Sequence, residues 1–145
     1  MYQAGRARNG LVSLAHVSDA WRGGLSFGMY GFDYGLPTVP GGERARIEGD
    51  RRELRGKAEH TFGAGALRYL RAEGSTQWYT HDEVEEDGAV ATTFDLRTQT
   101  ANVTAKTRVG RLDGAVGLQG LFRQYEAQGE EALTPAATTT SGSSW

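Results

Sequence analysis

The sequence predicts an all-β protein, an antiparallel up-and-down meander in which each strand lies beside its neighbours along the chain. Three observations support this fold class. The 145 residues include 21 Gly but only 3 Pro, and Thr, Ser, Tyr and Arg are frequent, which favours strands and turns over helices. Turn-rich segments recur at intervals that suit strands. Between these segments, apolar and polar residues alternate with the period of two that is typical of a β-strand.

The turn-rich segments divide the chain into seven predicted strands. Turns are predicted at residues 18–23, 35–43, 62–65, 81–91, 110–114 and 129–139. Strands are predicted at residues 10–17, 24–33, 46–60, 67–80, 92–108 and 115–127, with a last one starting near Thr140. The predicted turns alternate between short and long, so all the long connections fall at one end of the sheet. This asymmetry is typical of a membrane β-barrel whose two ends face the periplasm and the outside.

Composition limits the possible classes of protein. With 38% hydrophobic residues and a formal net charge of −2, the chain could be an ordinary soluble domain. No stretch reaches the roughly 18 apolar residues of a membrane-spanning helix, but a membrane β-strand needs only alternation over about 10 residues. The chain has no Cys, which excludes disulfides and Cys-ligated zinc. A net charge near zero does not favour nucleic acid as a partner.

Alternation assigns the residues of each predicted strand to two faces. Between Leu70 and Tyr79 the charged residues, Arg71 and Glu73, have odd numbers, whereas the even-numbered residues are apolar or small. We expect the apolar faces to contact lipid and the charged faces to line the lumen of a partial transmembrane β-barrel. The alternative is one sheet of a soluble sandwich. The apolar faces are rich in Gly, Ala and Thr, which would bury little area in a soluble core.

The third predicted strand fits this alternation least well. Leu54, Gly56 and Ala58 share a parity that Ile47 does not. We therefore expect either a bulge or an extracellular extension before Arg51.

Aromatic residues gather at strand ends beside the predicted long loops. They are Tyr30, Tyr34, Trp78 and Tyr79. We expect them to belong to an interfacial aromatic girdle, which membrane barrels carry at the level of the lipid headgroups.

Four short motifs occur in a fixed order between about Ser18 and Pro135. They are DYGLP at residues 33–37, DRRELRG at 50–56, YTHDEVE at 79–85 followed by TTF at 92–94, and VGLQ at 116–119 followed by Arg123 and GEEAL at 129–133. In sequence and order they resemble segments that bound the loops of TonB-dependent outer-membrane receptors, in particular the branch related to zinc-uptake receptors.

The resemblance implies a barrel of about 22 strands closed around a plug domain, in the outer membrane of a Gram-negative bacterium. Residues 1–145 would form part of the barrel domain, with the plug domain absent, so we expect a fragment of a receptor. The implied partners are outer-membrane lipid, the plug domain and the TonB complex, which would act through the missing N-terminal part. No cofactor is implied.

The implied activity is TonB-dependent uptake of a scarce nutrient, such as a metal ion, a metal chelate or a siderophore, and not catalysis. Residues 24–28 match the nucleophile-elbow pattern GxSxG, but no helical period follows them, as that motif requires. Zinc-type relatives often carry a His-rich run after the Gly-Leu-Pro element, whereas residues 38–42 contain no His. A passive porin-like barrel and a soluble β-rich binding module are the alternative functions.

Two groups of residues are candidate sites. His81, Asp82, Glu83 and Glu85 are candidates for ligand binding at the start of a long loop, and His81 and Glu83 for metal binding, because imidazole and carboxylate groups suit a divalent cation. The alternative is a solvated outer loop. A second group is expected to form a charged lumen wall, although any barrel lumen tolerates such charges. It consists of Arg55, Arg71, Glu73, Lys106 and Arg123.

Overall fold

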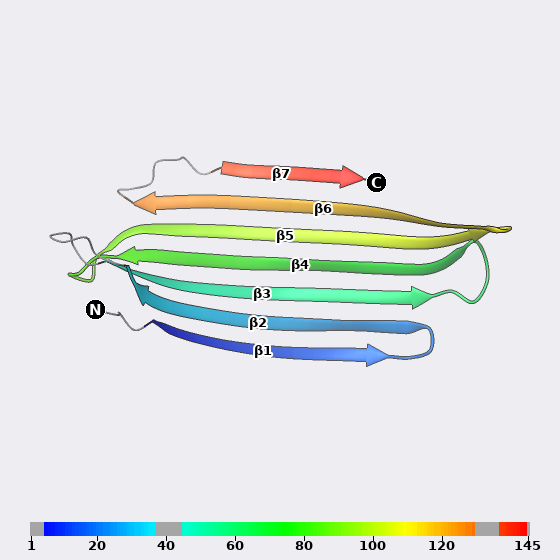
Figure 1. Cartoon of the computed structure of the whole chain (residues 1–145), viewed down its shortest axis with the longest axis horizontal. Helices are drawn as coiled ribbons and strands as arrows, with labels where there is room; N and C mark the ends of the chain where they lie inside the picture. The colour runs from blue at the N-terminus through cyan, green and yellow to red at the C-terminus, as the bar shows by residue number, and fades with distance from the viewer. Residues whose placement is uncertain (1–4, 37–44, 130–136, 145) are drawn as a thin grey trace.

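The chain forms one sheet of seven antiparallel strands in sequence order (Figure 1). The computed structural model describes residues 5–36, 45–129 and 137–144. The strands are β1 (Arg6–Val17), β2 (Trp21–Gly35), β3 (Arg46–Thr61), β4 (Leu67–Val84), β5 (Val90–Val109), β6 (Leu112–Gly129) and β7 (Ala137–Ser144). Each strand pairs with its sequence neighbours, so β1 and β7 form the edges. The predicted all-β meander is confirmed, whereas closure into a barrel stays a prediction.

The connections fall at two ends of the sheet (Figure 1). We call the end with residues 18–20, 62–66 and 110–111 the proximal end. The opposite end, where residues 85–89 connect β4 to β5 and where β2 and β6 end, is the distal end. The turns predicted at residues 35–43 and 129–139 fall mostly on residues 37–44 and 130–136, which lie outside the described residues. No helix in the described part of the chain is both long enough and apolar enough to cross a membrane.

The prediction of a long loop at residues 81–91 is wrong. β4 continues to Val84 and β5 begins at Val90, and Glu83 pairs directly with Thr92. The turn between the strands is closed by a hydrogen bond from the Glu85 N–H to the Ala89 carbonyl. Charged residues suggested a loop, but they are equally compatible with a strand whose side chains remain solvated. The contrast between short and long connections is therefore weaker than predicted.

Cross-strand pairing gives the sheet two chemically different faces, because directly paired residues project to the same side. One row of pairs connects Leu25 to Gly56, Gly74, Ala101 and Gly120 across β2 to β6. We call the side of this row the apolar face. The other side, which carries Arg71 and Glu73, is the charged face.

Of the two alternatives expected before Arg51 in β3, a bulge or an extracellular extension, the bulge is not present. β3 pairs with β2 and β4 in continuous register from Arg46 onward. Ile47 lies on the charged face, opposite Tyr34 and Glu83. Apolar and polar residues do not alternate regularly along β3 because the distal part of the apolar face carries charged residues. The register shifts of the described strands lie instead between β4 and β5.

The sheet is a single layer within the described residues. Among the described side chains only Val84 and Thr92 are buried. On the apolar face Leu14 is 77% exposed and Leu118 is 61% exposed. Exposed apolar surface of this extent is typical of a region that contacts a membrane or another protein.

Candidate functional site

The apolar face contains a continuous band without charged residues, which we call the apolar band. On β4 it runs from Leu70 to Trp78, close to the 9 to 11 residues with which a tilted strand crosses a membrane. The register extends this band over six strands. Its apolar, glycine and threonine members are Gly10, Val12, Leu14, Trp21, Gly23, Leu25, Phe27, Met29, Leu54, Gly56, Ala58, Leu70, Ala72, Gly74, Thr76, Trp78, Ala101, Val103, Ala105, Val116, Leu118, Gly120 and Phe122. The polar residues His16, His60 and Gln99 lie in the same rows.

Among the described side chains of β1 to β6 that are in register with the band, charged residues appear on the same face toward the distal end. The first row that contains them pairs Arg52 with Trp78, and Trp78 with Arg97. Acidic residues dominate the rows beyond it, where Arg6 and Arg8 of β1 also lie. These acidic residues are Asp33, Glu48, Asp50, Asp82, Asp95 and Glu126.

The five residues predicted to form a charged wall all lie on the charged face. Only Arg71 and Glu73 contact each other, through hydrogen bonds from the Arg71 guanidinium to the Glu73 carboxylate. Arg55 instead forms an ion pair with Glu53 of the same strand, at 2.7 Å. The Lys106 ammonium lies 5.3 Å from the ring centre of Tyr69. The group is therefore distributed over the face and does not converge on one point.

An open depression of about 810 Å³ includes Arg55, Glu73 and Asn102 of this face. Two of its lining residues, Ser75 and Thr100, form a hydrogen bond between their hydroxyls across β4 and β5 at 2.8 Å. Such a polar surface can line a water-filled lumen or accept a polar domain.

The structure separates the predicted ligand-binding cluster. His81 and Glu83 lie on the charged face, whereas Asp82 lies on the apolar face and accepts a hydrogen bond of 2.6 Å from Thr93. Glu85 is in the turn after β4. Within the described residues, no group of three or more His, Asp or Glu side chains is placed to hold a metal ion. Because neighbouring strand residues project to opposite sides, sequence proximity did not bring these groups together.

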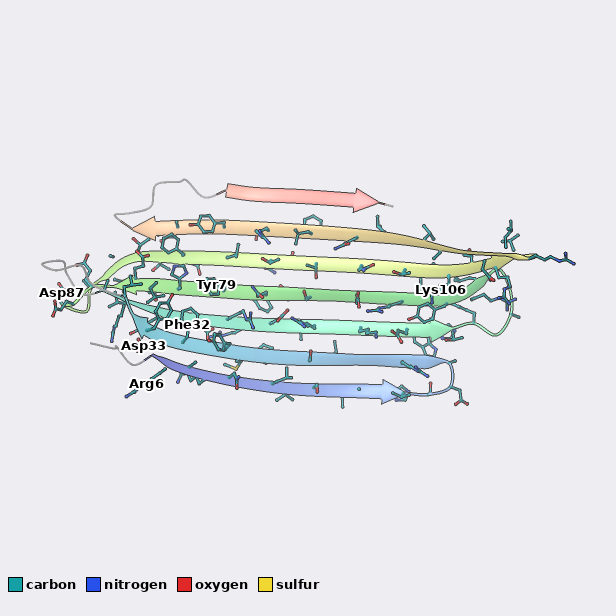
Figure 2. All side chains as sticks on the ribbon, in the orientation of Figure 1. Arg6, Phe32, Asp33, Tyr79, Asp87 and Lys106 are labelled. Carbon is teal, nitrogen blue, oxygen red and sulfur yellow. The ribbon has the colours of Figure 1, made fainter. Side chains whose placement is uncertain are left out.

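His81 belongs to a different group, an aromatic ladder on the charged face. Its ring stacks on Phe94 with a centroid distance of 4.6 Å and contacts Tyr79 at 5.5 Å. The contacts continue to Phe32 on one side and to Tyr125 on the other. Figure 2 shows Phe32 and Tyr79 side by side near the distal end, far from Lys106. Tyr30 and Tyr34 extend the aromatic ladder along β2.

The four residues predicted to form an aromatic girdle do not share one face of the sheet. Tyr30, Tyr34 and Tyr79 lie on the charged face, and only Trp78 lies on the apolar face. Trp21, which the prediction did not include, lies on the apolar face at the proximal margin, opposite His60. The parity of each aromatic residue along its strand could have identified the face on which it lies. The contacts of the aromatic ladder depend in addition on the register between strands.

One further charged pair lies at the proximal end. Arg108 and Asp113 flank the tight β5–β6 turn and approach to 2.6 Å. Gly110 in this turn has a φ of 62°, which glycine adopts without strain. The hydrogen bond from Arg108 lowers the pKa of the Asp113 carboxyl below its usual value.

No protein-family model matches the chain, and no curated protein sequence matches it significantly.

Proposed function

We propose that this chain forms part of the wall of a bacterial outer-membrane β-barrel, with the apolar face toward lipid and the charged face toward the lumen. The observation that carries the proposal is the apolar band, which extends over six strands without a charged residue. An apolar outer band opposite a polar interior is the pattern of transmembrane β-barrels.

The composition of the band favours lipid over a second protein layer. Its central row contains Gly56, Gly74, Ala101 and Gly120, and such small residues contribute little buried area to a soluble core. In lipid the band needs only to lack charge. The charges that begin at one level across β3 to β5 also agree with a boundary between hydrocarbon and headgroups.

Within this class, we propose a TonB-dependent receptor that takes up a scarce nutrient, such as a metal ion, a metal chelate or a siderophore. The four motifs support this proposal by resemblance. The aromatic ladder would lie near the outer opening, where its ring edges and hydroxyls could contact a ligand. The charged face would contact the plug domain, and the TonB complex would act through that domain. We propose no catalytic role.

Paired substitutions test the membrane orientation. Leu118→Arg places a charge on the apolar face, whereas Gln119→Arg places the same charge on the charged face one residue later. An arginine facing lipid near mid-membrane costs about 2–4 kcal/mol, so only Leu118→Arg should reduce assembly into phosphatidylcholine vesicles. Assembly is measured by flotation and protease protection. Equal effects of the two substitutions would contradict the orientation.

The receptor assignment has a separate test. Sequencing the DNA upstream of this reading frame should find a plug domain in the same frame. A barrel without a plug would instead support a passive porin-like function.

A further inference from the structure

The distal margin of the apolar band contains a row of two arginines around one tryptophan. Trp78 on β4 pairs with Arg52 on β3 and with Arg97 on β5. The guanidinium carbon of Arg97 lies 5.9 Å from the centre of the Trp78 ring. Because paired residues share a face, the side chains of Arg52 and Arg97 project from the apolar face on either side of Trp78.

An open depression of about 670 Å³ borders Arg52 and Trp78 of this row. It is lined by Phe27, Asp50, Arg52, Trp78 and Thr80, all on the apolar face. Phe27 and Trp78 give it an apolar side toward the band, and Arg52, Thr80 and the carboxylate of Asp50 give it a polar side toward the distal end. It can therefore accommodate a molecule that is apolar at one end and polar at the other.

The polar side has the charge to bind an anion. The side chain of Arg52 is 58% exposed, and its contact with Asp50, at 2.8 Å, uses Nε. The terminal amino groups of Arg52 can still donate hydrogen bonds outward. Within the described part of the chain Arg97 forms no ion pair. Guanidinium groups bind phosphate oxygens with charge-assisted hydrogen bonds.

The acidic residues beyond the row limit where an anion can bind. The next row toward the distal end has Arg8 on β1 but Asp50, Asp95 and Glu126 on β3, β5 and β6, so it would repel a phosphate beside β3 to β6. The favourable position is therefore confined to the level of Arg52 and Arg97.

We propose that the row Arg52–Trp78–Arg97 binds the phosphate of an outer-leaflet glycolipid whose acyl chains lie along the apolar band. This inference rests on the proposed membrane orientation. The indole would lie at the headgroup level, where tryptophan is favoured. The two arginines would hold the headgroup, and Phe27 would contact the start of an acyl chain.

The test uses the full chain in neutral-detergent micelles. The substitutions Trp21→Phe and Trp145→Phe leave Trp78 as the only tryptophan, so the fluorescence emission comes from Trp78. A diphosphorylated glucosamine-disaccharide lipid is titrated, and the same lipid without phosphates is the comparison. We expect the phosphorylated lipid to change Trp78 emission at much lower concentration. Arg52→Gln with Arg97→Gln should weaken its affinity about 30-fold, since each arginine contributes roughly a fivefold attraction to an anionic headgroup.

The matched control is Arg51→Gln with Arg123→Gln, which removes two arginines from the charged face of β3 and β6. It should change the affinity by no more than about twofold, because these charges lie across the sheet from the lipid. Equal losses in the two double variants would overturn the proposal. Equal binding of the phosphate-free lipid would also overturn it, as would the same Trp78 change with inorganic phosphate alone.

The two proposals can fail separately. If wild-type chain assembles in phosphatidylcholine vesicles and Leu118→Arg does not, the membrane orientation stands. Unchanged lipid affinity in Arg52→Gln with Arg97→Gln would then reject the phosphate site alone. If Leu118→Arg and Gln119→Arg change the association with vesicles equally, both proposals are rejected. Far-UV circular dichroism of each variant verifies that the strands have formed.

Discussion

The ring of Phe32 in β2 lies over the backbone of Gly49 in β3. The two residues are direct cross-strand partners, and a Cβ added at Gly49 would overlap the ring. The space above Gly49 lets Phe32 stack on Tyr79 of β4, with a centroid distance of 6.3 Å. Because Gly49 has no side chain, the aromatic residues of β2 can reach those of β4 across β3.

Gly49→Ala should displace Phe32 and separate the two parts of the aromatic ladder. Overpacking of this kind costs about 1–3 kcal/mol, so the free energy of unfolding should fall by that amount in urea titrations of the chain in micelles. The control is Gly28→Ala in β2, which lies on the same face of the sheet as Gly49. A Cβ added at Gly28 would have its nearest neighbouring atom at 3.6 Å. This variant should keep the wild-type stability. A similar loss in both would show that the Phe32 contact is not the cause.

Trp21 and Trp78 should mark the two interfaces of the membrane, because they lie at opposite margins of the apolar band. In single-tryptophan variants, each should be quenched more strongly by lipids brominated near the headgroup than by lipids brominated near the chain end. Leu25→Trp in a tryptophan-free background is the control, since Leu25 lies in the central row. It should show the reverse order. Deep quenching of Trp21 or Trp78 would contradict the proposed limits of the band.

Ser75 and Thr100 should stabilise the sheet through their cross-strand hydrogen bond of 2.8 Å. A double-mutant cycle with Ser75→Ala and Thr100→Val should give a coupling free energy of about 0.2–1 kcal/mol. The cycle is measured by unfolding in micelles. Additive effects would mean that water or other side chains satisfy these hydroxyls equally well.

Asp113 should titrate below the usual range of an aspartate, because Arg108 donates a hydrogen bond to its ionised form. A carboxyl with a lowered folded-state pKa stabilises the fold above its unfolded pKa of about 4, and this contribution is lost as the pH falls through the folded-state pKa. The effect should be small because both side chains are solvated. The titration is followed by the NMR shift of the carboxyl carbon.

In Arg108→Gln the midpoint of Asp113 should rise toward the usual value. An unchanged midpoint would show that the ion pair does not persist in solution.

The order and approximate position of the strands could be predicted from the sequence. Alternation between Leu70 and Tyr79 is a local property, and so is the glycine-rich turn at Gly110. The extent of β4 and β5 could not be predicted in this way. His81 to Val84 look like loop residues because they are mostly charged, yet Glu83 pairs with Thr92 as part of a hairpin that extends beyond the apolar band.

The faces of the candidate site could be predicted better than its contacts. Parity alone places Arg71 and Glu73 on one face, and the register agrees. Parity places Arg55 and Glu53 on one face of β3, where they form an ion pair within the strand. Parity does not show that His81 stacks on Phe94 of the neighbouring strand. That contact depends on the alignment between strands, which the connecting turns determine. The aromatic ladder was therefore missed, although every ring in it is visible in the sequence.

The identity between strand order and chain order also affects how the sheet can assemble. Each pairing joins segments that are adjacent in the sequence, so a new strand has to close only a short loop before its hydrogen bonds form. Chains dominated by such local pairings have low contact order and fold faster than those with distant pairings. The sheet can therefore grow one hairpin at a time from any starting point, and an error of alignment in one hairpin can be corrected without dissociating the others.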